Sequence, residues 1–242
     1  RLGVWYRNNR SVPQEDPLEE RGDAPIAPGS HLVSVPRTVS VNGFRSVQVN
    51  VDVSGNNILG DAANEPSICM DLNDPKKLAI GWRQFDSVKS NFRQAGNGYS
   101  TDGGASWHMN RVFTPGTFRS DPVLCAMPSG SFYYNSLQQT FYDDVFGSAD
   151  RGATWRFLSP ATGGDKQWMT VDTTSGIGRG NLYQCWSTAG NNYGGRQFSR
   201  STNGSASWSD PINIPGYPIW GTLRSEEHTS ELQSRVDISY AV

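Results

Sequence analysis

The sequence has little of what several functional classes require. Charged residues make up only 18% of its 242 residues, and the formal net charge is −2. The chain therefore has no general electrostatic attraction to nucleic acid or to an anionic membrane surface, and we predict neither partner. No apolar run approaches the roughly 18 residues of a membrane-spanning helix, so no membrane span is expected. In addition, no window of about a dozen residues has apolar residues at helical spacing without also containing Gly or Pro. This argues against helices.

Cysteine and histidine are scarce as well, with three residues of each. Cys69 and Cys125 each follow a proline by three positions. We interpret them as small buried side chains on equivalent strands, because their spacing indicates neither a disulfide framework nor a redox motif. The histidines are scattered along the chain, so the sequence predicts no metal site and no cofactor.

The sequence is instead rich in turn-forming and aromatic residues, with 26 Gly, 14 Pro and 11% aromatics. One pattern, Ser-x-Asp-x-Gly-x-Ser/Thr-Trp, begins at Ser100 and at Ser148. It returns in altered form at Ser201, where Asn203 replaces the Asp and Ser205 replaces the Gly. Recurrence at roughly 50 residues is typical of an array of four-stranded units, above all of a β-propeller.

Each copy of this pattern suits a tight corner between two strands. The carboxylate can accept backbone N–H groups, the glycine adopts positive φ without a Cβ penalty, and the hydroxyls add local hydrogen bonds. The tryptophan then enters the next strand and buries a large ring between layers. We interpret the corners as a folding device rather than as a site. The structural positions are Ser100, Asp102, Gly104, Trp107, Ser148, Asp150, Gly152, Trp155, Ser201, Asn203 and Trp208.

The predicted fold class is all-β, a partial β-propeller of four-stranded antiparallel blades. Residues 1–30 are charged and proline-rich, and we expect them to form an irregular lead-in. Residues 31–223 form the incomplete propeller. The blades are expected at about 65–114, 120–160 and 165–214, with the start of a fourth at 217–223.

Residues 224–242 differ in character from the rest. Arg224–Ser234 and Ile238–Val242 resemble the in-frame translation of a sequencing adapter, and the repeat pattern stops at Leu223. We therefore expect a non-native tail here and a native protein that continues with further blades. The alternative is a short polar helix opening at Ser225-Glu226-Glu227.

The corners also indicate where chemistry would lie. Successive turns of an up-and-down blade alternate between its two ends, so a corner between strands three and four shares its end with the turn between strands one and two. Loops at the opposite end are the expected place for a binding site. The substrate-binding candidates in or beside those loops are Arg83, Asp86, Arg93, Arg119, Asp121, Asp165 and Trp168.

These residue types suit a carbohydrate. Aromatic rings stack on sugar faces, arginine forks bind carboxylates in bidentate fashion, and a pair of carboxyl groups can act as acid and base. A structural interpretation stands beside this one. Asp121-Pro122 and Asp165-Lys166 fall where Glu65-Pro66 falls, just before an inner strand, and a repeated acid can simply bond backbone N–H groups or pair with a neighbouring arginine. Trp168 is equally compatible with a core position.

The three corners resemble the Asp-box, or BNR, repeat of the sialidase superfamily. The stretches Asn64–Ile68, Gly81–Asp86 and Tyr99–Gly104 also resemble bacterial sialidase-like proteins that carry this repeat. The resemblance covers about residues 40–223. It implies a six-bladed propeller, of which about three blades are present, an extracellular protein, and a glycan or glycoprotein as partner.

For activity, the resemblance implies a glycoside hydrolase of exo-α-sialidase type that acts on terminal sialic acids. That family uses an arginine triad, an aspartic acid/base and a tyrosine nucleophile assisted by a glutamate. Its first arginine lies in an Arg-Ile-Pro-like motif that this sequence lacks, because Val35-Pro36-Arg37 does not match it. No catalytic residue is therefore assigned. Asp-boxes also occur in non-catalytic propellers, so the alternative is an extracellular propeller that binds glycans or proteins without hydrolysis.

Overall fold

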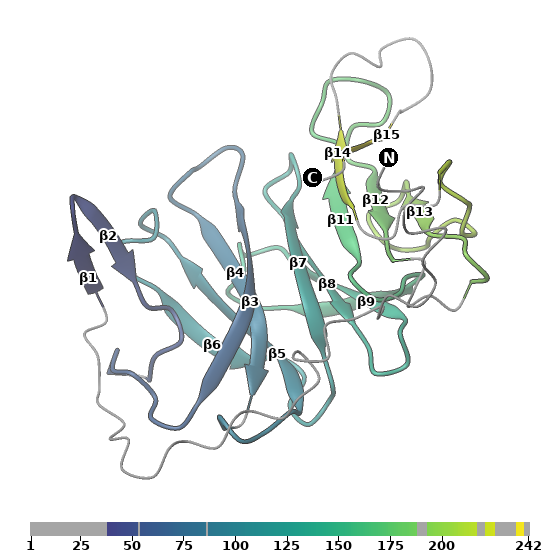
Figure 1. Ribbon diagram of the computed structural model, residues 1–242. Coiled ribbons are helices and arrows are strands. Elements are labelled where there is room, and N and C mark those ends of the chain that lie inside the picture. The colour runs from purple at the N-terminus through teal and green to yellow at the C-terminus, as the bar shows by residue number, and fades with distance from the viewer. Residues whose placement is uncertain are drawn as a thin grey trace. The chain divides into compact units, whose positions relative to one another are not determined.

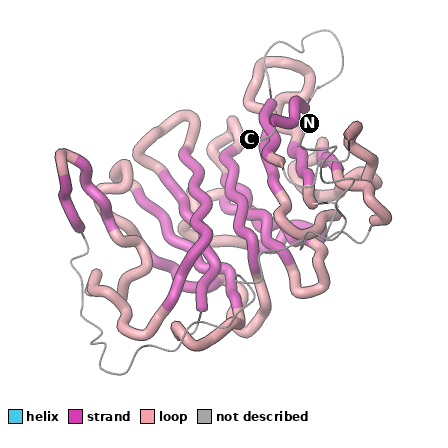
Figure 2. Tube along the Cα trace, in the orientation of Figure 1, coloured by secondary structure: helices cyan, strands magenta, loops and turns pink. Residues whose placement is uncertain are grey.

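The structure is a computed structural model that describes residues 38–52, 54–85, 87–187, 193–216, 221–225 and 236–239. These residues form strands, turns and loops and include no helix (Figure 2). None of the described segments is thus a helix with the length and apolarity needed to cross a membrane. The all-β fold class is confirmed, with four-stranded antiparallel sheets as the blade units of a partial propeller. The expected lead-in 1–30 and most of the expected tail 224–242 lie outside the described residues.

The chain divides into two compact units. The first unit holds the described residues of Gly22–Tyr134 and Gly147–Arg156, and the second unit holds those of Asn135–Phe146 and Phe157–Val242. The division passes through the strands of the second sheet. Each unit is described by itself below.

The first unit begins with a hairpin and continues with the first sheet (Figure 1). Asn42 (φ 51°) and Gly43 (φ 83°) form the hairpin turn, and two successive positive φ angles are what a two-residue turn between twisted strands requires. The sheet is an antiparallel meander in the order β3-β4-β5-β6. The strands are β1 (Thr38–Val41), β2 (Phe44–Val47), β3 (Ala62–Met70), β4 (Leu78–Phe85), β5 (Arg93–Ser100) and β6 (His108–Val112).

The second sheet has the same meander, and the third sheet is one strand short of it. The third sheet has the order β11-β12-β13. The blade expected at 165–214 would end in a fourth strand, but among the described residues only an isolated bridge joins Phe198 to Ile212. Beyond that bridge, the N–H of Arg200 donates to the hydroxyl oxygen of Ser209 at 3.1 Å and not to a backbone carbonyl. The strands are β7 (Ser120–Ala126), β8 (Phe132–Leu137), β9 (Asp143–Ser148), β10 (Arg156–Ala161), β11 (Trp168–Val171), β12 (Leu182–Cys185) and β13 (Phe198–Ser201).

In the first unit, β7 packs against β3 and β4 (Figure 1). The key side chain is Tyr134, which is almost fully buried and donates its hydroxyl proton to the carbonyl of Gly96 at 3.3 Å. The ring lies directly on Gly81, where an added Cβ would overlap the tyrosine ring and come within 2.8 Å of Leu124 Cδ1. Glycine at position 81 is therefore what allows the sheet and β8 to approach so closely.

In the second unit, the core is a cluster of Tyr183, Cys185, Ile214 and Leu223, with Phe198 packed against it. Leu223 belongs to β14 (Thr222–Ser225), which contacts β11 and β12 and pairs with β15 (Val236–Ser239). Burial of Leu223 shows that the last residue of the repeat pattern contributes to the core. The non-native origin of the residues that follow stays a prediction.

The first repeated corner is closed by its own polar side chains. Ser100 Oγ donates to Asp102 Oδ1 at 2.8 Å and accepts the N–H of Gly104 at 2.9 Å. Asp102 in turn accepts the N–H and the hydroxyl of Ser106, at 2.9 and 2.6 Å. Glycine is favoured at Gly104 because φ is 84° there, although Ser205 adopts φ 66° at the same position of the third copy. The side chains of Ser100, Asp102 and Ser106 thus bond one another and the backbone of their own corner.

The second and third corners repeat this geometry with one instructive change. In the second copy, Asp150 accepts both the N–H and the hydroxyl of Thr154, at 2.8 and 2.6 Å. In the third copy, Asn203 Oδ1 still accepts the N–H of Ser207 at 3.0 Å, but Asn203 Nδ2 now donates to Ser207 Oγ at 2.8 Å. The side-chain bond has reversed direction because an amide nitrogen is a donor where a carboxylate oxygen is an acceptor.

The corners also join successive layers. Asn110 of β6 donates to the carbonyls of Gly152 and Ala153, both at 3.0 Å, within the first unit. In the second unit, the hydroxyl oxygens of Ser159 in β10 and Ser205 in the third corner lie 3.1 Å apart. A corner therefore fixes not only its own turn but also its contact with the preceding sheet or strand.

Candidate functional site

Loops at the end opposite the corners meet in the first unit. The corner after β5 lies beside the β3–β4 turn, because the N–H of Gly103 donates to the carbonyl of Lys76 at 2.9 Å. At the other end, the N–H of Arg119 donates to the carbonyl of Arg93 at 2.9 Å. The N–H of Gly116 also donates to Gln94 Oε1 at 2.8 Å. The loop before β7 is thereby held against the start of β5.

This junction forms an edge with two aromatic rings and two arginines, which we call the Arg93 edge. Its members are Phe92, Arg93, Phe118 and Arg119. The rings of Phe92 and Phe118 meet edge-to-face with centroids 6.2 Å apart, and the Arg93 guanidinium carbon lies 5.8 Å from the Phe118 centroid. That distance is within the range of a cation–π interaction. Phe92 is 38% exposed, whereas Arg119 is buried.

The guanidinium of Arg83 is bonded by other side chains of the protein. Its Nη2 lies 2.7 Å from Glu65 Oε1, and its Nε donates to Asn64 Oδ1 at 2.8 Å. The side chain of Arg83 is buried on β4, opposite Asn64 of β3 in the strand register. Two of its donor groups thus hold the start of β3, which is a positioning role.

Asp121 lies at a strained backbone position that repeats. Its φ is 47°, and Glu65 and Lys166 have φ values of 49° and 51°. The sequence places Glu65 and Asp121 just before their inner strands, but Glu65 lies within β3, at its register shift, and Asp121 is the second residue of β7; Lys166 precedes β11. Left-handed backbone at a residue other than glycine costs roughly 1–2 kcal/mol. The spacing of the repeats predicts that Asp165 is the counterpart of Glu65 and Asp121. The residue with the matching positive φ is instead Lys166. The carboxylate of Asp121 accepts the Ser120 hydroxyl at 2.6 Å.

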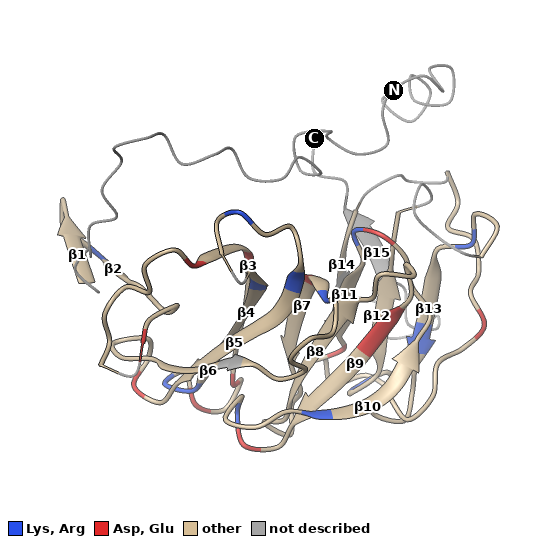
Figure 3. Ribbon diagram, turned by 90° about the horizontal axis from the view of Figure 1, so that it is seen from below, with Lys and Arg blue, Asp and Glu red and all other residues tan. Residues whose placement is uncertain are grey.

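The predicted candidates therefore separate into groups. Arg93 and Arg119 come together, and Arg83 pairs with Glu65, all in the first unit. Asp165 is buried in the second unit, where its carbonyl accepts the N–H of Ser187, and Trp168 is exposed at the start of β11. Asp86 lies outside the described residues. Figure 3 marks the basic and acidic positions along the strands.

The second unit contains acidic residues that the sequence reasoning missed. Asp143 and Asp144 open β9 and are both buried. The carboxylate of Asp143 lies against the backbone of Gly163, where an added Cβ would collide with it. Burial raises the pKa of Tyr193, and Tyr142 and Asp143 shift that pKa in the same direction. Two adjacent acids, Asp143-Asp144, were the signal that the sequence offered.

The three cysteines are free thiols, of which Cys69 and Cys185 are buried. Burial raises the pKa of Cys125 and of Cys185 to about 12, so both thiols stay protonated at neutral pH. The same cause raises the pKa of Cys69. No group of three or more His, Cys, Asp or Glu side chains among the described residues is arranged to hold a metal ion.

Comparisons with known proteins find similarity among solved structures. No protein-family model matches the chain, and no curated protein sequence matches it. An α-L-arabinofuranosidase of Fusarium graminearum in complex with arabinobiose has a TM-score of 0.49 and 16% identity, over 66% of this chain and 52% of that one. An α-L-arabinanase of Penicillium chrysogenum with arabinobiose has a TM-score of 0.47 and 18% identity, over 66% and 53%.

An intramolecular trans-sialidase from Ruminococcus gnavus, in complex with oseltamivir carboxylate, is also similar. Its TM-score is 0.41 at 17% identity, over 61% of this chain and 33% of that one. The chain thus spans about half of the length of the first two structures and a third of the last. Because the named proteins differ in substrate, the comparisons assign no substrate to this chain.

Proposed function

We propose that this protein is an extracellular glycan-binding propeller whose Arg93 edge takes an acidic sugar, and that the complete protein is a glycoside hydrolase of exo-α-sialidase type. One observation carries the proposal. The Arg93 guanidinium lies over the ring of Phe118, which meets the exposed ring of Phe92 edge-to-face, and the backbone of Arg93 is bonded by the N–H of Arg119. The edge therefore combines a cation with an aromatic surface.

An acidic sugar presents the two matching features. Its carboxylate suits an arginine fork, since charge-assisted bonds of this kind are about twice as strong as neutral ones. Its apolar ring face suits an aromatic ring. Arg83 is not part of this proposal as a ligand, because its guanidinium already bonds Glu65 and Asn64.

Binding is tested with a matched pair of sugars on the full chain. We expect 3′-sialyllactose to bind more tightly than lactose, which lacks the carboxylate. Arg93→Ala should remove that preference, while Arg200→Ala, an exposed arginine on β13, should not. Equal affinities for the two sugars, or a preference that survives Arg93→Ala, would contradict an acidic-sugar site at this edge.

Binding without hydrolysis is the second candidate, and one observation favours it. Two described acids at this end of the first unit already have partners: Glu65 pairs with Arg83, and Asp121 accepts the Ser120 hydroxyl. The two candidates are separated by incubating a complete protein with a fluorogenic sialoside. Release of the fluorophore supports the hydrolase, and binding of sialyllactose with no release supports the binding protein.

A further inference from the structure

An open cleft in the second unit has the composition of a saccharide site. It lies along β10 and the third corner and has a volume of about 560 Å³. Ligand sites commonly measure about 300–1,000 Å³, so the cleft has room for a di- or trisaccharide. The side chains used below are those of Gln138, Tyr142, Thr162, Tyr193 and Trp208.

Three aromatic rings line this cleft. The rings of Tyr142 and Tyr193 meet edge-to-face, with centroids 5.7 Å apart. Trp208 donates its indole N–H to Ser205 Oγ at 3.1 Å, which fixes the orientation of the ring. Tyr142 is 39% exposed, so part of its ring is accessible to a ligand. Rings held in place by the protein stack on a sugar without losing much conformational entropy.

Hydrogen-bonding groups accompany the rings. Thr162 Oγ1 accepts a hydrogen bond from Gln184 Nε2 at 3.0 Å, and a hydroxyl that accepts one bond still has its own proton to donate. The raised pKa of Tyr193 keeps its hydroxyl protonated at neutral pH. Gln138 adds an amide side chain. Sugars need this combination, since each ring has an apolar face and a rim of hydroxyls.

The lining also indicates the charge of the ligand. Among the described residues that line the cleft, none is charged. A carboxylate or phosphate moved from water into the cleft would lose hydration without gaining an opposite charge there. The chemistry thus differs from that of the Arg93 edge, where the cations lie.

We propose that the cleft lined by Tyr142, Tyr193 and Trp208 binds a neutral oligosaccharide. This site is separate from the Arg93 edge and does not depend on the function proposed for that edge.

The test uses the full chain and three neutral probes: cellotetraose, arabinobiose and β-1,3-galactotriose. Binding is followed by isothermal titration calorimetry and by the fluorescence of tryptophan, because Trp208 lines the cleft. We expect at least one probe to bind, and Tyr142→Ala to weaken that binding about tenfold, as the loss of one good stacking contact should.

Phe141→Ala is the matched control. Phe141 neighbours Tyr142 on the same loop and is 40% exposed, but it does not line the cleft. Its replacement should leave the affinity within about twofold, which is a fraction of a kcal/mol. Circular dichroism of both variants shows whether the fold is retained.

Three results would overturn the proposal. One is that none of the three probes binds at about 10 mM to protein that is folded. Another is that a probe binds with an affinity that Tyr142→Ala leaves unchanged. The third is that a proline-rich peptide binds this cleft while the saccharides do not, since such peptides also dock on aromatic grooves. Failure of sialyllactose to bind at the Arg93 edge would contradict the proposed function but not the proposed cleft site. The two proposals are therefore tested separately.

Discussion

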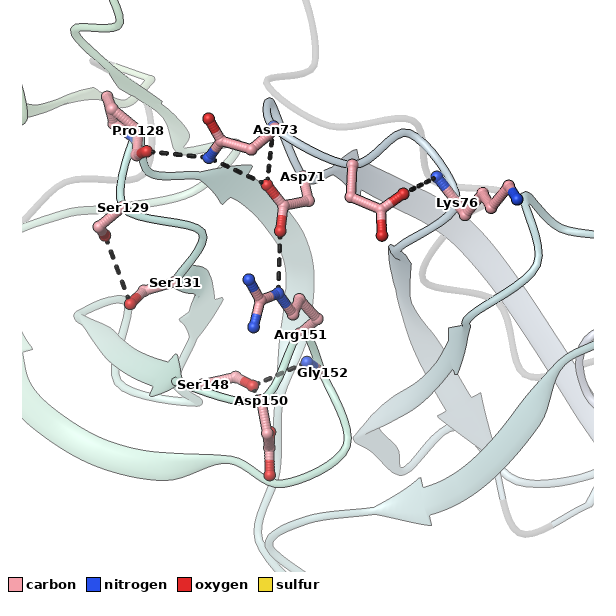
Figure 4. Close-up of polar contacts among 11 residues, drawn as sticks. Asp71, Asn73, Lys76, Pro128, Ser129, Ser131, Ser148, Asp150, Arg151 and Gly152 are labelled. Carbon is pink, nitrogen blue, oxygen red and sulfur yellow. Dashed lines mark hydrogen bonds and ion pairs between the residues drawn. The ribbon is translucent and has the colours of Figure 1, made fainter.

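Arg151 Nε donates to Asp71 Oδ2 at 2.9 Å, and this bond ties the second repeated corner to the end of β3 in the first sheet (Figure 4). The side chain of Asp71 is fully buried, whereas that of Arg151 is 44% exposed. The hydrogen bond from Arg151 and the N–H of Asn73 hold the pKa of Asp71 below its usual value. A corner that closes one turn therefore also neutralises a buried acid in the preceding sheet.

Removing Arg151 should destabilise the first unit. Arg151→Ala leaves the buried Asp71 carboxylate without its cation, and we expect a loss of about 1–2 kcal/mol in the free energy of unfolding at pH 7. Loss of one partner from a fully buried pair costs about 3–5 kcal/mol, but water screens the exposed half of this one. Urea denaturation measures the loss, and Arg151→Lys serves as the control that keeps the charge.

The pH dependence of that loss has a definite sign. Because the pKa of Asp71 is lowered on folding, the pair stabilises the protein above the ordinary pKa of about 3.8, and this stabilisation disappears as the pH falls through the folded-state value. The difference between wild type and Arg151→Ala should therefore shrink below pH 4 or so. A difference that stays constant in acid would contradict the role assigned to Asp71.

Replacing Asp102 of the first corner by asparagine should destabilise the protein less than replacing it by alanine. Asn203 shows that an amide can occupy this position, keeping the backbone bond and reversing the side-chain bond. Thermal unfolding should therefore give the order wild type, Asp102→Asn, Asp102→Ala from most to least stable at pH 7. An asparagine variant as unstable as the alanine variant would show that the negative charge itself is required.

The difference in stability between wild type and Asp102→Asn should also depend on pH. The hydroxyl and N–H of Ser106, together with the Ser100 hydroxyl, lower the pKa of Asp102 to about 2. The carboxylate stabilises the corner above the ordinary pKa of about 3.8, and that contribution is lost as the pH falls toward about 2. Between these values the advantage of wild type over Asp102→Asn should decrease, which melting curves at a series of pH values can follow.

Gly81→Ala should disturb the layer contact in the first unit. The new Cβ would overlap the ring of Tyr134, which is buried and cannot withdraw, so we expect a loss of about 1–3 kcal/mol on denaturation. Gly176→Ala is the matched control, since Gly176 lies on the surface and its added Cβ would meet Thr174 Oγ1 at an ordinary 3.4 Å. Equal effects of the two changes would mean that the loss comes from the backbone and not from the contact.

Arg83→Met distinguishes positioning from ligand binding. If Arg83 holds Glu65 and Asn64 in place, its loss should lower the free energy of unfolding by about 2–3 kcal/mol, because Arg83 is buried and Glu65 is 30% exposed. Glu65→Gln, which keeps a hydrogen-bond acceptor, should cost less. A variant of normal stability that no longer binds sialyllactose would instead place Arg83 among the ligand contacts.

Local features of the fold could be predicted from the sequence because short-range chemistry determines them. The corners at Asp102, Asp150 and Asn203 bond groups no more than four residues away, so each is complete within its own motif. The outer strand of the third sheet was a wrong prediction, because the N–H of Arg200 bonds the hydroxyl of Ser209 and not a backbone carbonyl, a contact that the repeat period does not indicate.

The candidate site depended on contacts between distant residues. Sequence reasoning selected Arg83 and Arg93 alike, since both are arginines at one end of a blade. Their difference lies in what folding places beside them: Glu65 and Asn64 bond the guanidinium of Arg83, whereas the guanidinium of Arg93 lies over Phe118, with its Nη2 3.5 Å from Asn91 Oδ1. No spacing in the chain indicates which acid reaches which arginine.

The repeating all-β architecture can be inferred from the amino-acid sequence, because the strand period and the corner chemistry act over a few residues. Folding sets which side chains are paired, as with Asp71 and Arg151, and which line a cleft, as with Tyr142 and Trp208. Burial and hydrogen bonding between layers depend on how whole sheets pack, and these contacts join residues that are far apart in the chain.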